Sequence, residues 1–167
     1  MNKRNIILIG MPGVGKSSIG VILAKTLGYE FVDTDLVIQK KENRLLREII
    51  AEEGDERFLE IENEVNATLE ADRCVIAPGG SVIYGQEAME HFQKIGTIVY
   101  LKLSYEELKK RLGNLKGRGV VLKEGQTLQE LYEERVCLYE KYADLVVDEE
   151  NKDIEATLQA IRDELGM

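Results

Sequence analysis

A glycine-rich segment near the N-terminus has the residue types and spacing of a phosphate-binding loop. Residues 10–17 match the pattern G-x-x-x-x-G-K-[ST] at every required position. Glycines allow a tight turn whose backbone N–H groups point inward, Lys16 can reach the β- and γ-phosphates, and Ser17 offers a hydroxyl to Mg²⁺. A simple tight turn, or a retained but inactive nucleotide site, is the alternative interpretation. We assign ATP binding to Gly10, Met11, Pro12, Gly13, Val14, Gly15, Lys16, Ser17 and Ser18.

Two carboxylates follow the second apolar segment of the chain. Phe31 and Val32 predict a short strand, and Asp33-Thr34-Asp35 stands directly after it. Ligands of open α/β sheets sit beyond the carboxyl ends of the strands, so both carboxylates should lie near the phosphate loop. One could hold Mg²⁺, and the other could accept a proton or hydrogen bond from a substrate hydroxyl. In the alternative interpretation Asp33 ends the strand and Asp35 caps the next helix.

Strand and helix patterns alternate along the chain and would position these residues. Short apolar runs predict strands, and amphipathic segments between them predict helices. Their order indicates an α/β fold, a five-stranded parallel sheet with helices on both faces, in one domain over residues 1–167. Residues 113–126, rich in glycine and cationic side chains, are expected to form a mobile lid. The expected strands are 5–9, 31–33, 74–77, 97–103 and 145–147, and the expected helices are 16–27, two or three within 36–70 broken near residue 54, 87–94, 105–112, 128–143 and 154–165.

The composition narrows the class of partner. The 167 residues carry a net charge of −9, so a broad surface for nucleic acid or anionic membranes is not expected. Cys74 and Cys137 lie far apart and form neither a disulfide framework nor a zinc pattern. No apolar run approaches the roughly 20 residues that span a bilayer. We expect a cytoplasmic protein whose partners are ATP and a small-molecule substrate; the sequence is compatible with a monomer but does not specify the oligomeric state.

Several further segments, taken in order, give the chain a specific resemblance. The phosphate loop is followed by residues 31–35 (FVDTD), 54–58 (GDERF), 78–80 (PGG), an arginine at 118, and 134–139 (ERVCLY). The phosphate loop occurs in many families, but this combination is much more specific. Over nearly its whole length the chain resembles shikimate kinase.

The resemblance implies a P-loop kinase that converts shikimate to 3-phosphoshikimate with ATP and Mg²⁺. Asp33 would then lie near Mg²⁺, beside the hydroxyl of Ser17. Asp35 would contact the hydroxyl that is phosphorylated, and Lys16 would act on the phosphates. Arg118, on the lid, would swing over the transferring phosphate, since phosphoryl transfer depends on positioning and cationic stabilisation.

The resemblance also implies how the two substrates are held. Gly79 and Gly80 would line the substrate pocket with backbone, and Arg135 would bind the substrate carboxylate. Arg111 would lie against adenine. The alternative interpretation of Arg135 is a surface ion pair with Glu134 or another acid.

Three positions depart from the family pattern. Leu59 stands where the family has an arginine that grips the shikimate carboxylate, Pro78 replaces the first of three glycines, and Gly119 replaces a lid proline. An arginine–carboxylate pair is bidentate, and removing one partner of such a buried pair typically costs about 2–5 kcal/mol. Arg44 or Arg47, on the preceding helix, could supply the missing cation.

Two substrate hypotheses follow, with two wider alternatives. The chain is either a divergent kinase of shikimate or a kinase of the same type that acts on another polyol or hydroxy acid. A nucleotide or sugar-acid kinase is disfavoured, because residues 55–64 are too acidic to form a pocket for an anionic nucleotide. A non-catalytic nucleotide-binding module is disfavoured because Lys16, Ser17, Asp33 and Asp35 are all present.

Overall fold

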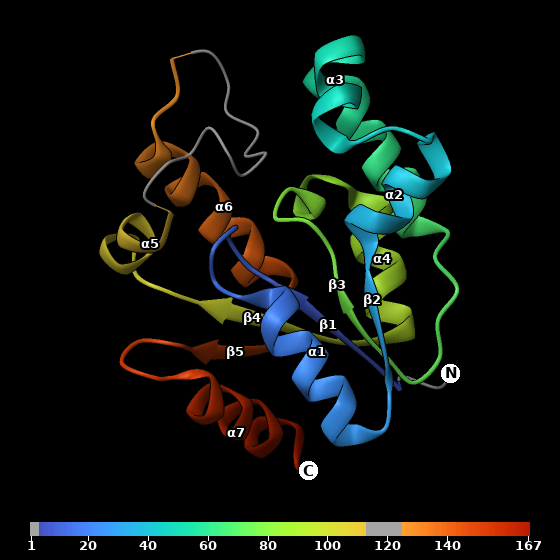
Figure 1. Ribbon diagram of the computed structural model, residues 1–167. Coiled ribbons are helices and arrows are strands. Elements are labelled where there is room, and N and C mark those ends of the chain that lie inside the picture. The colour runs from blue at the N-terminus through green and yellow to red at the C-terminus, as the bar shows by residue number, and fades with distance from the viewer. Residues whose placement is uncertain (1–3, 113–124) are drawn as a thin grey trace.

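A parallel sheet forms the centre of the molecule. The computed structural model describes residues 4–112 and 125–167, and within these ranges five strands pair in the order β2-β3-β1-β4-β5 (Figure 1). This confirms the predicted fold class. The predicted lid falls mostly outside the described residues. The strands are β1 (Asn5–Ile9), β2 (Glu30–Asp33), β3 (Cys74–Ala77), β4 (Gly96–Lys102) and β5 (Leu145–Asp148).

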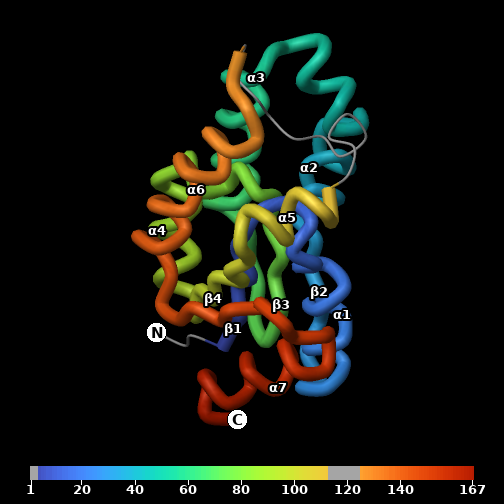
Figure 2. The backbone as a smooth tube through the Cα atoms, turned by 90° about the vertical axis from the view of Figure 1, so that its left-hand side faces the viewer, coloured from blue at the N-terminus to red at the C-terminus, as the bar shows by residue number. Residues whose placement is uncertain are grey.

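Helices cover both faces of the sheet. Figure 2 shows α4 and α6 on one face and α1 and α7 on the other. None of the helices in the described ranges is long and apolar enough to cross a membrane. The helices are α1 (Lys16–Leu27), α2 (Thr34–Glu42), α3 (Leu46–Ala67), a 3-10 turn η1 (Val82–Tyr84), α4 (Gln86–Ile95), α5 (Tyr105–Leu112), α6 (Leu128–Tyr142) and α7 (Ile154–Leu165).

The central strand β1 explains why the sheet forms in this order. A parallel sheet covered on both faces needs strands that are apolar on both sides, and all of β1 is buried. Within it, Ile7 is paired with Ile76 of β3 and with Ile98 of β4. The chain leaves β1 over one face through α1 and leaves β3 over the other face through α4 (Figure 2). Connections that diverge in this way open a crevice at the carboxyl ends of neighbouring strands.

A pair of helices, α2 and α3, rises beyond the carboxyl end of β2 (Figure 1). The pair has a small apolar core of its own, and α3 breaks at Gly54, where φ is 86° and ψ is 168°. The break lies where the sequence predicted it. Beyond the break α3 packs against α4, which fixes the orientation of its inner face. The buried members of this small core are Ile38, Ile49, Phe58, Ile61 and Val65.

Candidate active site

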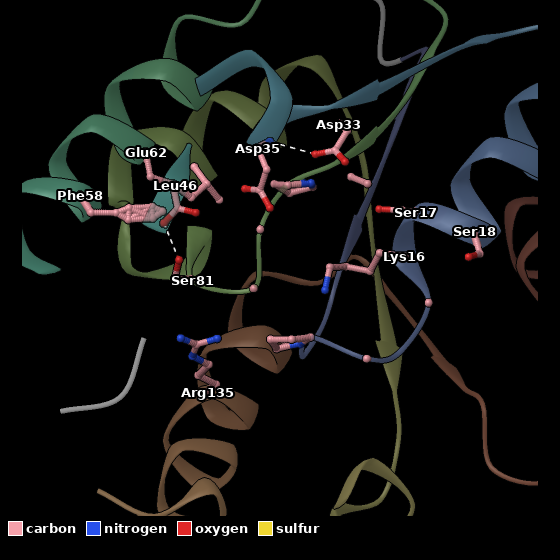
Figure 3. Close-up of a pocket in the computed structure, with 17 residues that line it drawn as sticks. Lys16, Ser17, Ser18, Asp33, Asp35, Leu46, Phe58, Glu62, Ser81 and Arg135 are labelled. Carbon is pink, nitrogen blue, oxygen red and sulfur yellow. Dashed lines mark hydrogen bonds between the residues drawn. The ribbon is translucent and has the colours of Figure 1, made fainter. Parts of the chain in front are cut away.

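A cavity of about 340 Å³ opens at the carboxyl ends of β1, β2 and β3. Figure 3 shows side chains from four separate segments around it: Lys16 from α1, Asp33 and Asp35 from the junction of β2 and α2, Glu62 from α3 and Arg135 from α6. These segments are distant in sequence, so only the fold brings their charges together. The sequence-predicted lining residues Gly79 and Gly80 border the same cavity.

The phosphate loop connects β1 to α1 with the geometry that its glycines allow. Gly13 and Gly15 adopt φ values of 92° and 86°, a left-handed conformation that side chains rarely tolerate. Gly15 is also the N-cap of α1, so the positive end of the helix faces the cavity. Of the nine ATP-binding residues predicted at positions 10–18, six line the cavity and three, Gly10, Met11 and Val14, are buried and do not line it. The six are Pro12, Gly13, Gly15, Lys16, Ser17 and Ser18.

Lys16 lies over this loop. Its Nζ donates hydrogen bonds to the carbonyl oxygens of Gly10, at 2.7 Å, and Met11, at 3.0 Å. Burial lowers the pKa of Lys16 to about 8, although the charge of Asp35 opposes this shift. A cation held this close to the helix N-terminus is available to a bound anion.

The two predicted carboxylates have different environments. Asp33 ends β2 and is the N-cap of α2, because its Oδ1 accepts a 2.9 Å hydrogen bond from the backbone N–H of Asp35. The alternative in which Asp35 is the cap is therefore wrong, and α2 begins at Thr34, before the predicted Leu36. Asp35 lines the cavity instead, and its buried Oδ1 has no hydrogen-bond partner among the described residues. Burial, and then the charge of Asp33, raise the pKa of Asp35 to about 6.

The residues predicted to hold Mg²⁺ fit that ion. Ser17 and Asp33 both line the cavity, and the hydrogen bond to Asp35 engages Oδ1 of Asp33. The described part of the chain contains no group of three or more acidic, histidine or cysteine side chains placed to hold a metal. Mg²⁺ takes one or two protein ligands and completes its shell with phosphate oxygens and water, so the hydroxyl of Ser17 and the carboxylate of Asp33 are a donor set of the kind that it uses.

Arg135 is a buried cation that forms no ion pair with another described residue. It is 1 % exposed, and no carboxylate of the described residues lies within ion-pair distance of it. Its guanidinium carbon lies 5.5 Å from the ring centroid of Tyr84, and its Nε has no hydrogen-bond partner. The alternative of a surface ion pair is thus wrong for Arg135. A buried guanidinium that borders a cavity is suited to bind an anion from outside the chain.

The second half of α3 contributes side chains whose roles the sequence analysis did not assign. Phe58 and Glu62 line the cavity, Leu46 joins them from the start of α3, and Ser81 from the loop after β3. Glu62 is 2 % exposed, and its Oε1 accepts a 2.6 Å hydrogen bond from the hydroxyl of Ser81. Positions 58 and 62 are one helical turn apart, so Glu62 shares a helix face with the aromatic Phe58. This spacing could have predicted from the sequence that Glu62 is buried.

Neither Arg44 nor Arg47 takes the place of the family arginine at position 59. Leu59 is half-buried and does not line the cavity. Arg44 forms ion pairs with Glu42, Glu52 and Glu53, away from the cavity. Arg47 is exposed and does not line the cavity either. The hypothesis that one of these two arginines reaches in is therefore wrong.

Glu149, directly after β5, is a further buried acid near the phosphate loop. It is 3 % exposed, and burial raises its pKa to about 7, against the opposing charges of Arg111 and Lys16. Its position directly after a strand, where ligands of such a sheet bind, could have identified Glu149 from the sequence.

Arg111, the predicted adenine contact, lies in the last turn of α5 with its Nε 3.8 Å from Glu107. Arg118 lies outside the described residues.

Comparisons with known proteins give the family. A family model described as shikimate kinase matches residues 12–166. The chain belongs to the shikimate kinase family. Curated shikimate kinases of Thermodesulfovibrio yellowstonii and Clostridium botulinum are 39 % and 41 % identical to it, over 88 % and 82 % of this chain and 86 % and 83 % of their own.

Solved structures agree with this membership in the shikimate kinase family. A shikimate kinase from Acinetobacter baumannii, in complex with shikimate, superimposes with a TM-score of 0.85 at 29 % identity, covering 98 % of this chain and 94 % of its own. The Aquifex aeolicus shikimate kinase gives 0.81 at 30 % identity, covering 97 % and 96 %. The chain is therefore a kinase that transfers a phosphoryl group to an alcohol and uses ATP.

Proposed function

We propose that the protein transfers the γ-phosphoryl group of ATP to a hydroxyl of shikimate, giving 3-phosphoshikimate. The observation that carries this proposal is Arg135, a buried cation that has no ion pair among the described residues and borders the same cavity as Lys16 and Asp35. Such a cavity suits an acceptor with a carboxylate at one end and a hydroxyl at the other. The Acinetobacter relative was solved with that kind of molecule bound.

The phosphate loop and α1 would bind the nucleotide. Backbone N–H groups of residues 10–17 and the N-terminus of α1 would hold the phosphates, and Lys16 would exchange its bonds to Gly10 and Met11 for phosphate oxygens. Ser17 and Asp33 would hold Mg²⁺, which neutralises charge on the phosphates. Arg111 would contact the adenine.

The other half of the cavity would bind the acceptor. Arg135 would hold the substrate carboxylate, and the backbone of Gly79 and Gly80 would lie along the ring. The free Oδ1 of Asp35 would accept a hydrogen bond from the attacking hydroxyl and orient it toward the γ-phosphate. Arg118 would stabilise the transferring group, as the family resemblance implies. We place the protein in the cytoplasm, as its sequence suggests.

Leu59 favours a second candidate, another hydroxy acid or polyol as the acceptor. Among the described residues, Arg135 is the one cation that borders the acceptor half of the cavity, because Leu59 stands where the family has a second arginine.

The test is ADP release by the purified protein with ATP, with and without Mg²⁺, and with shikimate or a panel of polyols and hydroxy acids. We expect Mg²⁺-dependent turnover with shikimate. Turnover with another member of the panel alone would replace shikimate by that acceptor.

A further inference from the structure

The guanidinium of Arg135 lies over an aromatic ring that does not itself border the cavity. Its Cζ is 5.5 Å from the centroid of the Tyr84 ring. This distance is within the roughly 6 Å over which the negative face of an aromatic ring attracts a cation. Tyr84 is partly buried and packs against the main apolar core, but it does not line the cavity. Any effect of the ring on a ligand in the cavity is therefore exerted through Arg135.

The short turn that carries Tyr84 is held on two sides. Tyr84 is the last residue of η1, whose other two residues, Val82 and Ile83, are buried in the core. Gly85 follows directly, and a Cβ atom built there would collide with the side chain of Asn63 on α3. The turn also packs against α6, the helix that carries Arg135. The ring of Tyr84 thus has a defined position relative to that helix.

The guanidinium is bounded on another side by the glycine loop after β3. A Cβ atom built on Gly80 would lie 3.0 Å from Nη1 of Arg135, so the missing side chain gives this nitrogen its space. Figure 3 shows the guanidinium pointing from α6 toward Ser81, in the same loop. The charge is therefore held between the ring of Tyr84 and the backbone that lines the cavity.

The kind of partner decides which donors of a buried guanidinium stay free. A carboxylate partner would occupy two N–H groups in the paired geometry that a substrate carboxylate also requires. An aromatic face attracts the charge through its π electrons and takes none of the five N–H donors. Arg135 forms no ion pair with another described residue, and its Nε has no hydrogen-bond partner among them. The ring of Tyr84 offsets part of the cost of burying the charge and leaves the donors for a ligand.

We propose that Tyr84 is a positioning residue for the carboxylate of the acceptor. Its ring holds the guanidinium of Arg135 beside Gly80, with the N–H donors free to bind that carboxylate. The proposal rests on the proposed function for the identity of the acceptor. Leu59 offers no second charge, so acceptor binding depends strongly on how this one guanidinium is held. Tyr84 acts on acceptor binding and not on the nucleotide.

Substitutions at position 84 separate the ring from its hydroxyl and from its apolar bulk. Tyr84→Phe keeps the aromatic face, whereas Tyr84→Leu removes it and stays apolar. We expect Tyr84→Leu to raise KM for shikimate about 3- to 30-fold, the range of a partly desolvated cation–π contact, with KM for ATP unchanged and kcat little changed. Tyr84→Phe should stay within about twofold of wild type.

A matched control pair lies elsewhere on the sheet. The guanidinium carbon of Arg73 lies 5.6 Å from the ring centroid of Tyr29, which is also partly buried, and neither residue lines the cavity. Tyr29→Leu therefore removes an equivalent contact without touching Arg135, and it should keep the wild-type KM for shikimate. An equal rise in KM for Tyr29→Leu and Tyr84→Leu would mean that the effect is a general loss of packing, and the proposal would be wrong.

A graded series tests the electrostatic part of the contact. Fluorinated phenylalanines placed at position 84 weaken the negative face of the ring in steps while its shape is nearly kept, and that face is what attracts the cation. We expect the logarithm of KM for shikimate to rise with each added fluorine. A flat series, or a loss in Tyr84→Phe as large as in Tyr84→Leu, would overturn the proposal.

A measurement without an acceptor separates this proposal from the proposed function. Urea denaturation of Tyr84→Leu, Arg135→Met and the double variant gives the coupling between the two side chains. We expect a coupling of about threefold or more in the unfolding equilibrium constant. If wild type phosphorylates no shikimate, the proposed function fails, and this coupling still judges the contact: its presence supports the proposal and its absence overturns it.

Discussion

Tyr139 donates a 2.6 Å hydrogen bond from its hydroxyl to the carbonyl oxygen of Gly80. Its ring is fully buried and stacks on Tyr100, with 5.1 Å between ring centroids. The bond ties α6 to the loop after β3, and Arg135 lies one helical turn earlier on α6. Tyr139 therefore fixes the distance between the buried cation and the glycine wall of the cavity.

Changing Tyr139→Phe tests this tie. The ring is retained, so packing should survive, but the Gly80 carbonyl loses its donor. We expect the free energy of unfolding to fall by about 0.5–1.5 kcal/mol and KM for shikimate to rise while KM for ATP stays constant. Urea denaturation and steady-state kinetics measure the two effects. Tyr142→Phe, on the same helix, is the control, and an equal rise in KM for that variant would contradict the account.

Changing Lys16→Ala should abolish most of the turnover. The Nζ group donates hydrogen bonds to two carbonyl oxygens of the phosphate loop, so it lies where the phosphates of ATP would bind. Removing one group that stabilises the charge of a transition state typically lowers kcat by about 10²–10³. Lys25→Ala, exposed in the last turn of the same helix, should leave kcat unchanged. Near-normal turnover by Lys16→Ala would mean that the phosphates bind elsewhere.

Changing Arg135→Lys keeps the charge but removes the planar fork that binds a carboxylate in a bidentate way. We expect KM for shikimate to rise at least about tenfold with a smaller change in kcat. The same kinetics on Lys141→Ala, exposed on the same helix, should match wild type. An unchanged KM in Arg135→Lys would indicate that another group holds the substrate carboxylate.

The sequence predicted the sheet, the helices and the phosphate loop well, because each depends on local pattern. The apolar run of β1 and the glycines at 13 and 15 specify their structure without distant partners. Glu62 shows the limit of such reasoning. Its carboxyl group is held by Ser81 from another segment and borders the space over Gly79, which are tertiary relationships that no local pattern contains.

The buried carboxyls predict a pH-dependent stability. Asp35, Glu62 and Glu149 have pKa values raised to about 6, about 7 and about 7, from 3.8, 4.5 and 4.5. The folded state thus binds these protons more tightly than the unfolded state. Their contribution is fully present below about pH 4 and is lost as the pH rises through about 7.

Glu62→Gln isolates one of these groups. The amide cannot ionise, so the variant should gain stability relative to wild type between pH 5 and pH 8, by about 1–3 kcal/mol. Denaturation at both pH values measures this difference. Glu64→Gln, at an exposed position on the same helix, should show no such gain, and a Glu62→Gln curve parallel to wild type would mean that Glu62 titrates normally.

The most direct test of the proposed activity is ³¹P NMR of a reaction with protein, ATP, Mg²⁺ and shikimate. We predict that ADP and a new phosphomonoester of shikimate appear together, in equal amounts, and that neither forms with Lys16→Ala. Release of inorganic phosphate without a new ester, or an ester that forms equally with Lys16→Ala, would contradict phosphoryl transfer at this site.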